Sequence, residues 1–351
     1  MSDPESRSVE LGLGLQGDKP PGAYAHLAAI AEDHGVDVIS VYADLMFQPP
    51  LPALLEIARA TTSVRLGPAC FSPFAIHPAE IAGQIAALDL ASDGRAFLGL
   101  ARGTWLDAIG IDQRQPVQAL EEAAGLVAAL LRHDRRGFDG AVFRMAPGTT
   151  LRYDTERPAV PLMIGTWGRR TGALAGRIAD EVKVGGSANP AMVAVMRSYI
   201  AAGAHSVGRN PDEVGIVLGA VSVVDEDGER ARARARTEVA MYLAVVADLD
   251  PTVAVPPAVL EPVRRLTAVG DHEAAGKLIP DEVLDRFAFS GTPEHVADLV
   301  AAVLAAGASR VDLGTPHGLT DEKGIELIGS GVLPLLGLGR GRAASMRGGD
   351  V

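Results

Sequence analysis

The chain has 351 residues, 48% of them hydrophobic, and its formal net charge is -12. This length and apolar content allow one large core, because α/β barrels reach about 250 residues or more. The acidic balance argues against nucleic acid or an anionic membrane as a partner, since clustered Lys and Arg are needed to neutralise phosphates. The single cysteine, Cys70, excludes an intrachain disulfide and a thiolate metal cluster. With a polar N-terminus and no apolar run of membrane-spanning length, we expect a cytoplasmic protein.

Short runs rich in β-branched residues alternate with Ala- and Leu-rich helical segments along the chain. The predicted strands are residues 9–16, 36–42, 64–70, 96–101, 161–165, 182–184, 214–223 and 310–314. The predicted helices are residues 22–34, 52–60, 77–90, 116–132, 169–179, 190–207, 228–246, 293–306 and 321–336. Eight strands alternating with helices indicate a parallel sheet, and eight is the number that closes a (β/α)8 TIM barrel. A doubly wound open sheet is the alternative.

Two segments interrupt this alternation. Residues 137–155 are predicted to form a hairpin. A proline-rich stretch separates the helix predicted at residues 228–246 from the elements that precede the last strand. We interpret residues 247–288, approximately, as an insertion over the top of a single barrel domain that spans residues 1–340. A simple excursion over the surface is the other interpretation of that insertion. Residues 341–351 are expected to be a flexible C-terminal tail.

The segments that follow the strands carry the candidate site, because barrel enzymes place their active sites at the carboxyl ends of the strands. These segments contain aromatic and apolar side chains, several glycines and small hydroxyls. They offer no set of His, Asp and Glu at metal-ligand spacing, so we expect no metal. Such surroundings suit a flat ring cofactor, and the turn at residues 165–170 is the best candidate for holding a phosphate at a helix start.

Four segments together carry a family likeness: LGPACFSPF at 66–74 followed by His77-Pro78, GRAFLGLARG at 94–103, residues 161–186 with LAGRIAD at 174–180, and FSGTPE at 289–294. In their order and spacing they resemble the bacterial luciferase-like superfamily, and within it the methylenetetrahydromethanopterin reductase-like branch that uses coenzyme F420. The likeness spans most of the chain, from about residue 10 to residue 336.

The resemblance implies an F420 cofactor lying across the barrel mouth, with its ring against the third strand. It also implies a non-prolyl cis peptide bond between Ala69 and Cys70, which places the backbone under the central ring. FMN is the alternative cofactor. The expected cofactor-binding residues are Ala69, Cys70, Arg102, Gly103, Gly165, Thr166, Trp167, Gly168, Gly185 and Gly186.

The sequence departs from the family pattern at three positions. Leu45 stands where members often have His, Thr104 where some deazaflavin-dependent members have a catalytic Glu, and Glu181 where Gly is usual, which we expect to disturb the turn near the phosphate. Protonation could come from another group, or the hydride could be transferred without a strong acid. The candidate catalytic residues are Asp44, His77 and Asp107, and the candidate substrate-binding residues are Tyr42, Phe47 and Trp105.

Each candidate also has an ordinary structural interpretation. Asp44 could cap a loop, and His77 could cap the helix that begins at Pro78. Cys70 is expected to be a small apolar filler, because nothing nearby in sequence would lower the pKa of its thiol. The two tryptophans could pack at the rim, and Arg102, Arg169 and Arg170 could form exposed salt bridges instead of binding an anion.

The leading hypothesis is an F420-dependent reductase or dehydrogenase that transfers a hydride between C5 of the cofactor and a small-molecule or natural-product substrate. An FMN-dependent luciferase-like monooxygenase is the first alternative. A non-catalytic flavin-binding paralogue is the second, because the Glu and His of relatives are missing. We expect a homodimer with a small-molecule substrate and no nucleic-acid or membrane partner.

Overall fold

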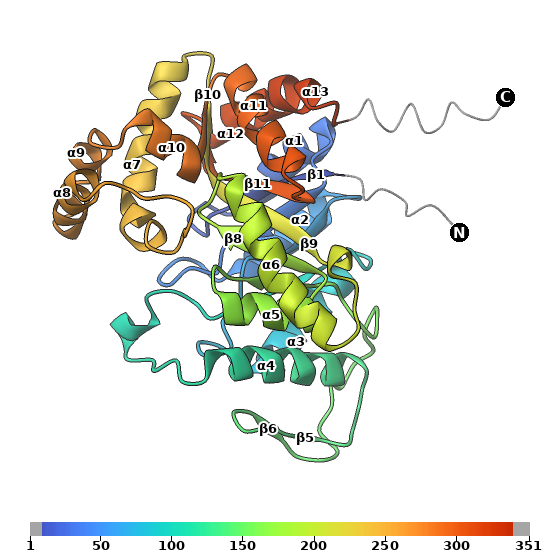
Figure 1. The fold of residues 1–351 in the computed structure, drawn as a ribbon. Coiled ribbons are helices and arrows are strands. Elements are labelled where there is room, and N and C mark those ends of the chain that lie inside the picture. The colour runs from blue at the N-terminus through green and yellow to red at the C-terminus, as the bar shows by residue number, and fades with distance from the viewer. Residues whose placement is uncertain (1–8, 340–351) are drawn as a thin grey trace, which may run out of the picture.

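A nearly closed ring of parallel strands forms the centre of the computed structural model, which describes residues 9–339 (Figure 1). The strands of the ring are β1 (Glu10–Leu15), β2 (Val38–Val41), β3 (Arg65–Pro68), β4 (Leu98–Ala101), β7 (Leu162–Gly165), β8 (Glu181–Gly185), β9 (Gly215–Val224) and β11 (Arg310–His317). Their order is β3-β2-β1-β11-β9-β8-β7-β4, and two parallel bridges join β4 back to the β3 side of the ring. The predicted (β/α)8 barrel is therefore confirmed, and the open sheet is excluded.

Helices cover the outside of this ring. They are α1 (Ala23–His34), α2 (Pro50–Ala60), α3 (Pro78–Ala91), α4 (Pro116–Leu131), α5 (Arg169–Ile178), α6 (Ala191–Ser206), α7 (Gly228–Val246), α11 (Pro293–Ala305) and α12 (Asp321–Leu327), which continues through a π-helical turn into α13 (Leu333–Leu335). Proline within the first two helical positions starts α2, α3, α4 and α11, where its missing N–H has no helical partner to lose. No helix within residues 9–339 is long and apolar enough to span a bilayer.

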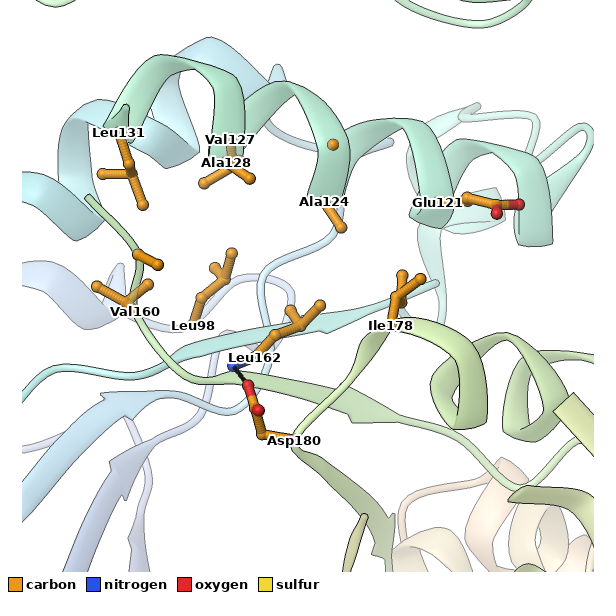
Figure 2. A pocket seen from close by; sticks show the side chains of 12 residues that line it. Leu98, Glu121, Ala124, Val127, Ala128, Leu131, Val160, Leu162, Ile178 and Asp180 are labelled. Carbon is orange, nitrogen blue, oxygen red and sulfur yellow. Dashed lines mark hydrogen bonds between the residues drawn. The ribbon is translucent and has the colours of Figure 1, made fainter. Parts of the chain in front are cut away.

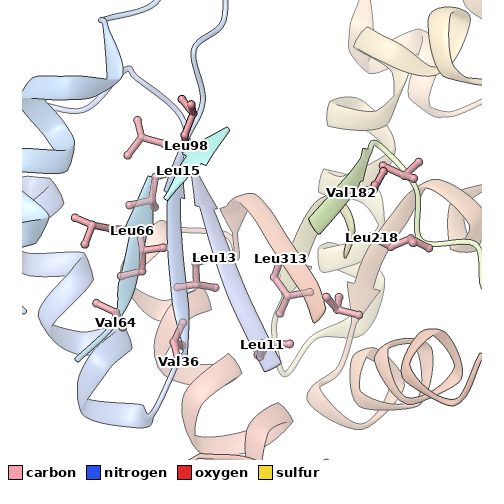
Figure 3. Packing of buried hydrophobic residues seen from close by; sticks show 14 of the residues in the cluster. Leu11, Leu13, Leu15, Val36, Val64, Leu66, Leu98, Val182, Leu218 and Leu313 are labelled. Atoms are coloured by element: carbon pink, nitrogen blue, oxygen red, sulfur yellow. The ribbon is translucent and has the colours of Figure 1, made fainter. Parts of the chain in front are cut away.

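Alternate residues of each strand face the helices and the barrel interior, as the two-residue period of a strand requires. On β1, Leu11, Leu13 and Leu15 are buried against the helical layer, as Figure 3 shows. Burying such a side chain contributes about 1.5–3 kcal/mol, so this layer supplies most of the apolar stabilisation. The intervening Gly12 and Gly14 face inward, where side chains from other strands fill the space.

The interior of the barrel has an apolar part and a charged part. Val38, Phe97 and Met163 form a small apolar cluster against Ala69 and Cys70. Charged side chains from β1, β3, β8 and β11 occupy the other part, namely Glu10, Arg65, Glu181, Lys183, Arg310 and Asp312. Barrel interiors are more commonly filled by Val, Ile and Leu, so this charged part is a distinctive feature of the chain.

A lobe beside the barrel, opposite the chain termini in Figure 1, contains α7 and three helices that follow it. These are α8 (Pro257–Ala268), α9 (His272–Gly276) and α10 (Asp281–Phe287), which pack with α7 in a second apolar cluster. The segment predicted as an insertion thus contains helices. It leads into β10 (Ala288–Gly291), a strand that the sequence pattern did not predict and that pairs with the far end of β9.

A short hairpin, β5 (Phe138–Asp139) with β6 (Arg144–Met145), lies where a hairpin was predicted. The C-terminal tail expected at residues 341–351 lies outside the described residues.

Candidate active site

The backbone directly after β3 has the conformation that the resemblance implies, because the bond between Ala69 and Cys70 is cis. Hydrogen bonds to both neighbouring strands hold this segment: the Ala69 N–H donates to the carbonyl oxygen of Val41, and the Phe71 N–H to that of Gly99, each at 2.9 Å. The thiol of Cys70 points into the barrel, toward the Cα positions of Gly99 and Gly165.

The Cys70 thiol is neutral at physiological pH. Burial raises its pKa to about 12, while the Lys183 charge opposes that rise. A thiol held neutral is a poor nucleophile, so the environment agrees with a filler beside the cofactor site.

Tyr42 follows β2 and reaches across the barrel. Its hydroxyl oxygen would lie 2.2 Å from a Cβ added at Gly14 and 2.5 Å from one added at Gly314, so both glycines are required to admit it. Lys183 Nζ lies 5.8 Å from the centre of the Tyr42 ring. Burial raises the pKa of Tyr42, and the charges of Asp312 and Asp44 raise it further. Tyr42 therefore keeps its proton and can act as a hydrogen-bond donor.

Asp44, in the loop after β2, is a partly buried carboxyl group with a raised pKa. Burial raises the pKa of Asp44, and a hydrogen bond from Gln16 Nε2 to Asp44 Oδ2 at 3.0 Å opposes that rise. The protonated form is thus more accessible than in a solvated aspartate, as a proton donor requires. Met46 and Phe47, further along this loop, are 81% and 45% exposed and give the rim an apolar surface.

The loop after β4 lies at the surface. Arg102 is exposed, and its carbonyl oxygen accepts a hydrogen bond from Ser72 Oγ at 2.7 Å. Trp105 is 50% exposed and precedes a short 3-10 helix, η1 (Leu106–Ile109), in which Asp107 is also exposed. Trp105 can therefore contact a ligand at the rim, whereas Asp107 has none of the burial that would adapt an acid for proton transfer.

His77 has the contacts of a helix cap. Its Nδ1 accepts a hydrogen bond from the Ala79 N–H at 3.2 Å at the start of α3, and its ring packs edge-on against Phe143. A catalytic role for His77 stays a prediction, and these contacts explain the residue without one.

The loops after β7 and β8 are joined at the predicted phosphate site. Trp167 Nε1 donates to the carbonyl oxygen of Gly185 at 2.9 Å, and the Gly168 N–H donates to Thr166 Oγ1 at 2.9 Å. Gly168 is the N-cap of α5 and has no side chain to accept from the first helical N–H groups. A Cβ added at Gly185 would meet no atom within 4 Å, so open space lies beside this helix start.

This arrangement fits the anionic tail of a phosphate-bearing cofactor. The first turn of α5 contains Arg169 and Arg170, both exposed, and no acidic residue. Free N–H groups and the positive end of the helix dipole favour an anion at such a position. Gly165 ends β7, and Thr166 and Gly186 lie in the two loops that border this position. The residues present therefore fit the cofactor that the resemblance implies.

The charged residues inside the barrel were not predicted from the sequence. Lys183 Nζ lies 2.6 Å from Asp312 Oδ2, and Arg310 contacts both Asp312 at 2.8 Å and Glu181 at 2.7 Å. Glu181 was expected to disturb the turn near the phosphate, but it is the first residue of β8 and bonds to Arg310 and Arg65 instead. A signal was present: charged residues alternate with valine or leucine at 181–184 and 310–313.

A buried polar contact ties the lobe to the barrel. Asn189, after β8, donates through Nδ2 to Asp250 Oδ2 at 2.8 Å and to Thr252 Oγ1 at 2.6 Å. Asp250 is 3% exposed, so the segment between α7 and α8 is held against the loop that follows β8.

A cavity of about 410 Å³ lies elsewhere, between α4 and the outer face of the barrel (Figure 2). Its lining includes Leu98 and Leu162, the first residues of β4 and β7, and Ile178 at the end of α5. It therefore lies toward the amino ends of these strands, away from the candidate site. Within residues 9–339, no three His, Cys, Asp or Glu side chains are grouped to hold a metal ion.

The fold and the residues at its strand ends define the class of the protein. A family model of luciferase-like monooxygenases matches residues 8–310, and the chain belongs to this family. This confirms the resemblance found in the sequence.

Among its relatives, the chain is similar to 5,10-methylenetetrahydromethanopterin reductase of Archaeoglobus fulgidus, with 30% identity over 338 residues that cover 93% of this chain and 100% of the relative. It is also 30% identical over 240 residues to F420-dependent glucose-6-phosphate dehydrogenase of Nakamurella multipartita, covering 64% of this chain and 70% of that protein. The solved structure of coenzyme F420-dependent tetrahydromethanopterin reductase from Methanopyrus kandleri superimposes with a TM-score of 0.83 at 26% identity, covering 93% of this chain and 99% of that one.

Proposed function

We propose that the protein is an F420-dependent oxidoreductase that transfers a hydride between the cofactor and a small-molecule substrate. The observation that carries this proposal is the start of α5, where an uncapped Gly168, two arginines and the open space at Gly185 form a place for an anionic cofactor tail. Relatives whose names include F420 dependence, at 30% identity, support the choice of cofactor.

The bound deazaflavin would supply the hydride chemistry, and the protein would supply position, electrostatics and exclusion of water. Residues 165–170, with Gly185 and Gly186, would hold the phosphate end. The backbone at Ala69 and Cys70 would lie under the ring. Arg102 and Gly103 would border it from the loop after β4.

Asp44 is the best-placed group to hold a proton for the substrate. Its raised pKa keeps the acid form accessible, and Gln16 fixes its orientation. Tyr42 would donate a hydrogen bond, because its hydroxyl stays protonated. Phe47 and Trp105 are exposed at the rim and would contact an apolar part of the substrate. The substrate class is therefore a molecule with an apolar body and one group that accepts a proton.

Titration of the purified protein with F420 and, separately, with FMN tests this function. We expect F420 fluorescence to be quenched with a dissociation constant in the micromolar range or below, and FMN to bind much more weakly. Binding of FMN alone would favour the luciferase-like monooxygenase alternative. Binding of neither would favour a non-catalytic paralogue. Turnover of enones, imines or nitro compounds with reduced F420 then tests catalysis.

We further propose that the enzyme works in the cytoplasm as a homodimer, without nucleic-acid or membrane partners. Light scattering on the purified protein tests the dimer, for which we expect a mass near twice the 36.4 kDa of the chain.

A further inference from the structure

The charged side chains inside the barrel form a column of alternating sign. Starting from the carboxyl ends of the strands, Lys183 contacts Asp312, Asp312 contacts Arg310, and Arg310 contacts Glu181 and, at 3.6 Å, Glu10. Arg65 ends the column by contacting Glu10 at 2.6 Å and Glu181 at 3.3 Å. Three cations thus balance three anions, and a cation stands at each end.

Neighbouring strands leave room for the upper part of this column. A Cβ added at Gly12 would lie 2.2 Å from Asp312 Oδ1, and one at Gly219 would lie 3.1 Å from Asp312 Cβ and 3.2 Å from Lys183 Cε. The Lys183 and Asp312 side chains are only 7% and 1% exposed. The pair therefore occupies a space that exists because two strands carry glycine where a larger residue would otherwise fill the barrel.

A contribution to stability does not explain this arrangement well. Removing two charges from water costs about as much as their attraction returns, and apolar residues of similar volume often serve stability as well or better. The position of the pair suggests a different role. Lys183 Nζ lies 5.8 Å from the centre of the Tyr42 ring, and a Cβ added at Gly219 would lie within 3.2 Å of both Lys183 and Asp312. Burial raises the pKa of the Cys70 thiol and the Lys183 charge lowers it, so the ammonium acts on a second residue that borders the expected ring site.

We propose that the buried ammonium of Lys183, held by Asp312 next to the Tyr42 ring, favours negative charge on the ring of the bound cofactor. This inference rests on the proposed function. A hydride is one proton with two electrons, so the ring that accepts it gains one negative charge. A cation screened little by water stabilises that charge more than a surface cation does. Asp312 opposes this effect only in part, because at the Cys70 thiol the Lys183 charge lowers the pKa by more than the Asp312 charge raises it.

The test compares the binding of oxidised and of reduced F420 to the full-length protein and its variants. Lys183→Met and Lys183→Gln remove the charge, and Lys183→Arg retains it. Arg65→Met is the control, because it removes one partly buried cation from the opposite end of the column. We expect the two neutral Lys183 variants to bind reduced F420 more weakly than the wild type does, with a smaller effect on oxidised F420. The ratio of the two dissociation constants should change by about tenfold. Lys183→Arg and Arg65→Met should keep the wild-type ratio.

Several results would overturn the inference. The ratio could stay at the wild-type value in the neutral Lys183 variants, or Arg65→Met could change it equally; in either case binding by the wild type would still support the proposed function. Failure of both neutral variants to fold, checked by circular dichroism, while Arg65→Met folds would assign Lys183 a structural role instead. If the wild type bound neither form of F420, the proposed function and this inference would fail together.

Discussion

Asp44 is the residue that we propose as the proton donor in this site. If its acid form is needed, activity falls as the pH rises through its raised pKa. Asp44→Asn cannot titrate, so we expect it to lose this part of the pH profile and to lower kcat by about a hundredfold. Asp107→Asn, at an exposed position, is the control and should leave the profile unchanged. If the pH profile of Asp44→Asn matched that of the wild type, another group would have to be the proton donor.

Gln16 offers an independent check of the same carboxyl group. Its amide donates to Asp44 Oδ2 and so lowers the pKa of Asp44. Gln16→Leu removes that donor, and the pKa should rise. We therefore expect the activity of this variant to fall at a higher pH than that of the wild type, as measured by kcat against pH. A shift to lower pH would contradict the assignment of Asp44 as the acid.

A substitution at Gly185 is expected to change the affinity for F420 without changing the stability of the fold. A Cβ there would meet no atom within 4 Å, so Gly185→Ala should change the free energy of unfolding by no more than about 0.5 kcal/mol. The same methyl group would occupy space expected to hold the cofactor tail, so the dissociation constant for F420 should rise several-fold. Gly83→Ala, on α3, also has room and should leave binding unchanged. If Gly185→Ala bound F420 with wild-type affinity, the cofactor tail would have to bind elsewhere.

At the scale of elements, one substitution at the start of α5 is expected to increase the stability of the protein and to weaken cofactor binding. Gly168→Asp would supply the N-cap acceptor that α5 lacks, and should stabilise the protein by a few tenths of a kcal/mol. Its carboxylate would repel a phosphate at the same place, so we expect F420 affinity to fall by about tenfold or more. Gly168→Ser, a neutral cap, is the control and should bind more tightly than Gly168→Asp. Equal affinity in these two variants would contradict an anion site here.

Most elements of the fold were predictable because their patterns are local. The eight strands of the ring and the helices between them follow from runs such as Leu11–Leu15 and from prolines that begin helices. β10 was not predictable, because the four residues AFSG contain no alternation and the strand exists only through pairing with the extended end of β9. The charged column was missed for a related reason: charged residues in strands suggest an exposed face until the closed ring places that face inside.

The site was predictable in part. The resemblance located the cis bond between Ala69 and Cys70. The turn at residues 165–170 stays a prediction as the phosphate site. The contacts of Lys183 were hidden, since Asp312 lies 129 residues away and meets it only when the barrel closes. His77 illustrates the opposite case, because its interpretation as a cap follows from the adjacent Pro78, and the structure shows that cap.

For the whole molecule, the buried column predicts how stability depends on pH. Burial would raise the pKa of Asp312, but Arg310 and Lys183 lower it to about 2 from the usual 3.8. Since the unfolded chain binds the proton more readily, the stability from Asp312 is present above pH 3.8 and is lost as the pH falls toward 2. Urea unfolding between pH 5 and about pH 2 should show this loss.

The contribution of Asp312 itself can be isolated. Asp312→Asn should be less stable than the wild type at neutral pH by about 3–5 kcal/mol, because Lys183 loses its partner. It should also lose less stability on acidification. Asp139→Asn is the control, since that side chain is 91% exposed, and it should follow the wild type throughout. An acid-induced loss in Asp312→Asn as large as that in the wild type would show that other carboxyl groups account for it.

The position of the cofactor is the central claim, and hydrogen–deuterium exchange of the full-length protein with and without saturating F420 tests it most directly. We expect protection from exchange to concentrate at residues 69–72, 165–172 and 185–189, the segments after β3, β7 and β8. The segments that line the cavity beside α4 should exchange at the same rate with and without F420. Protection confined to that cavity, or absent from all three strand-end segments while F420 is bound, would contradict the site described for this protein.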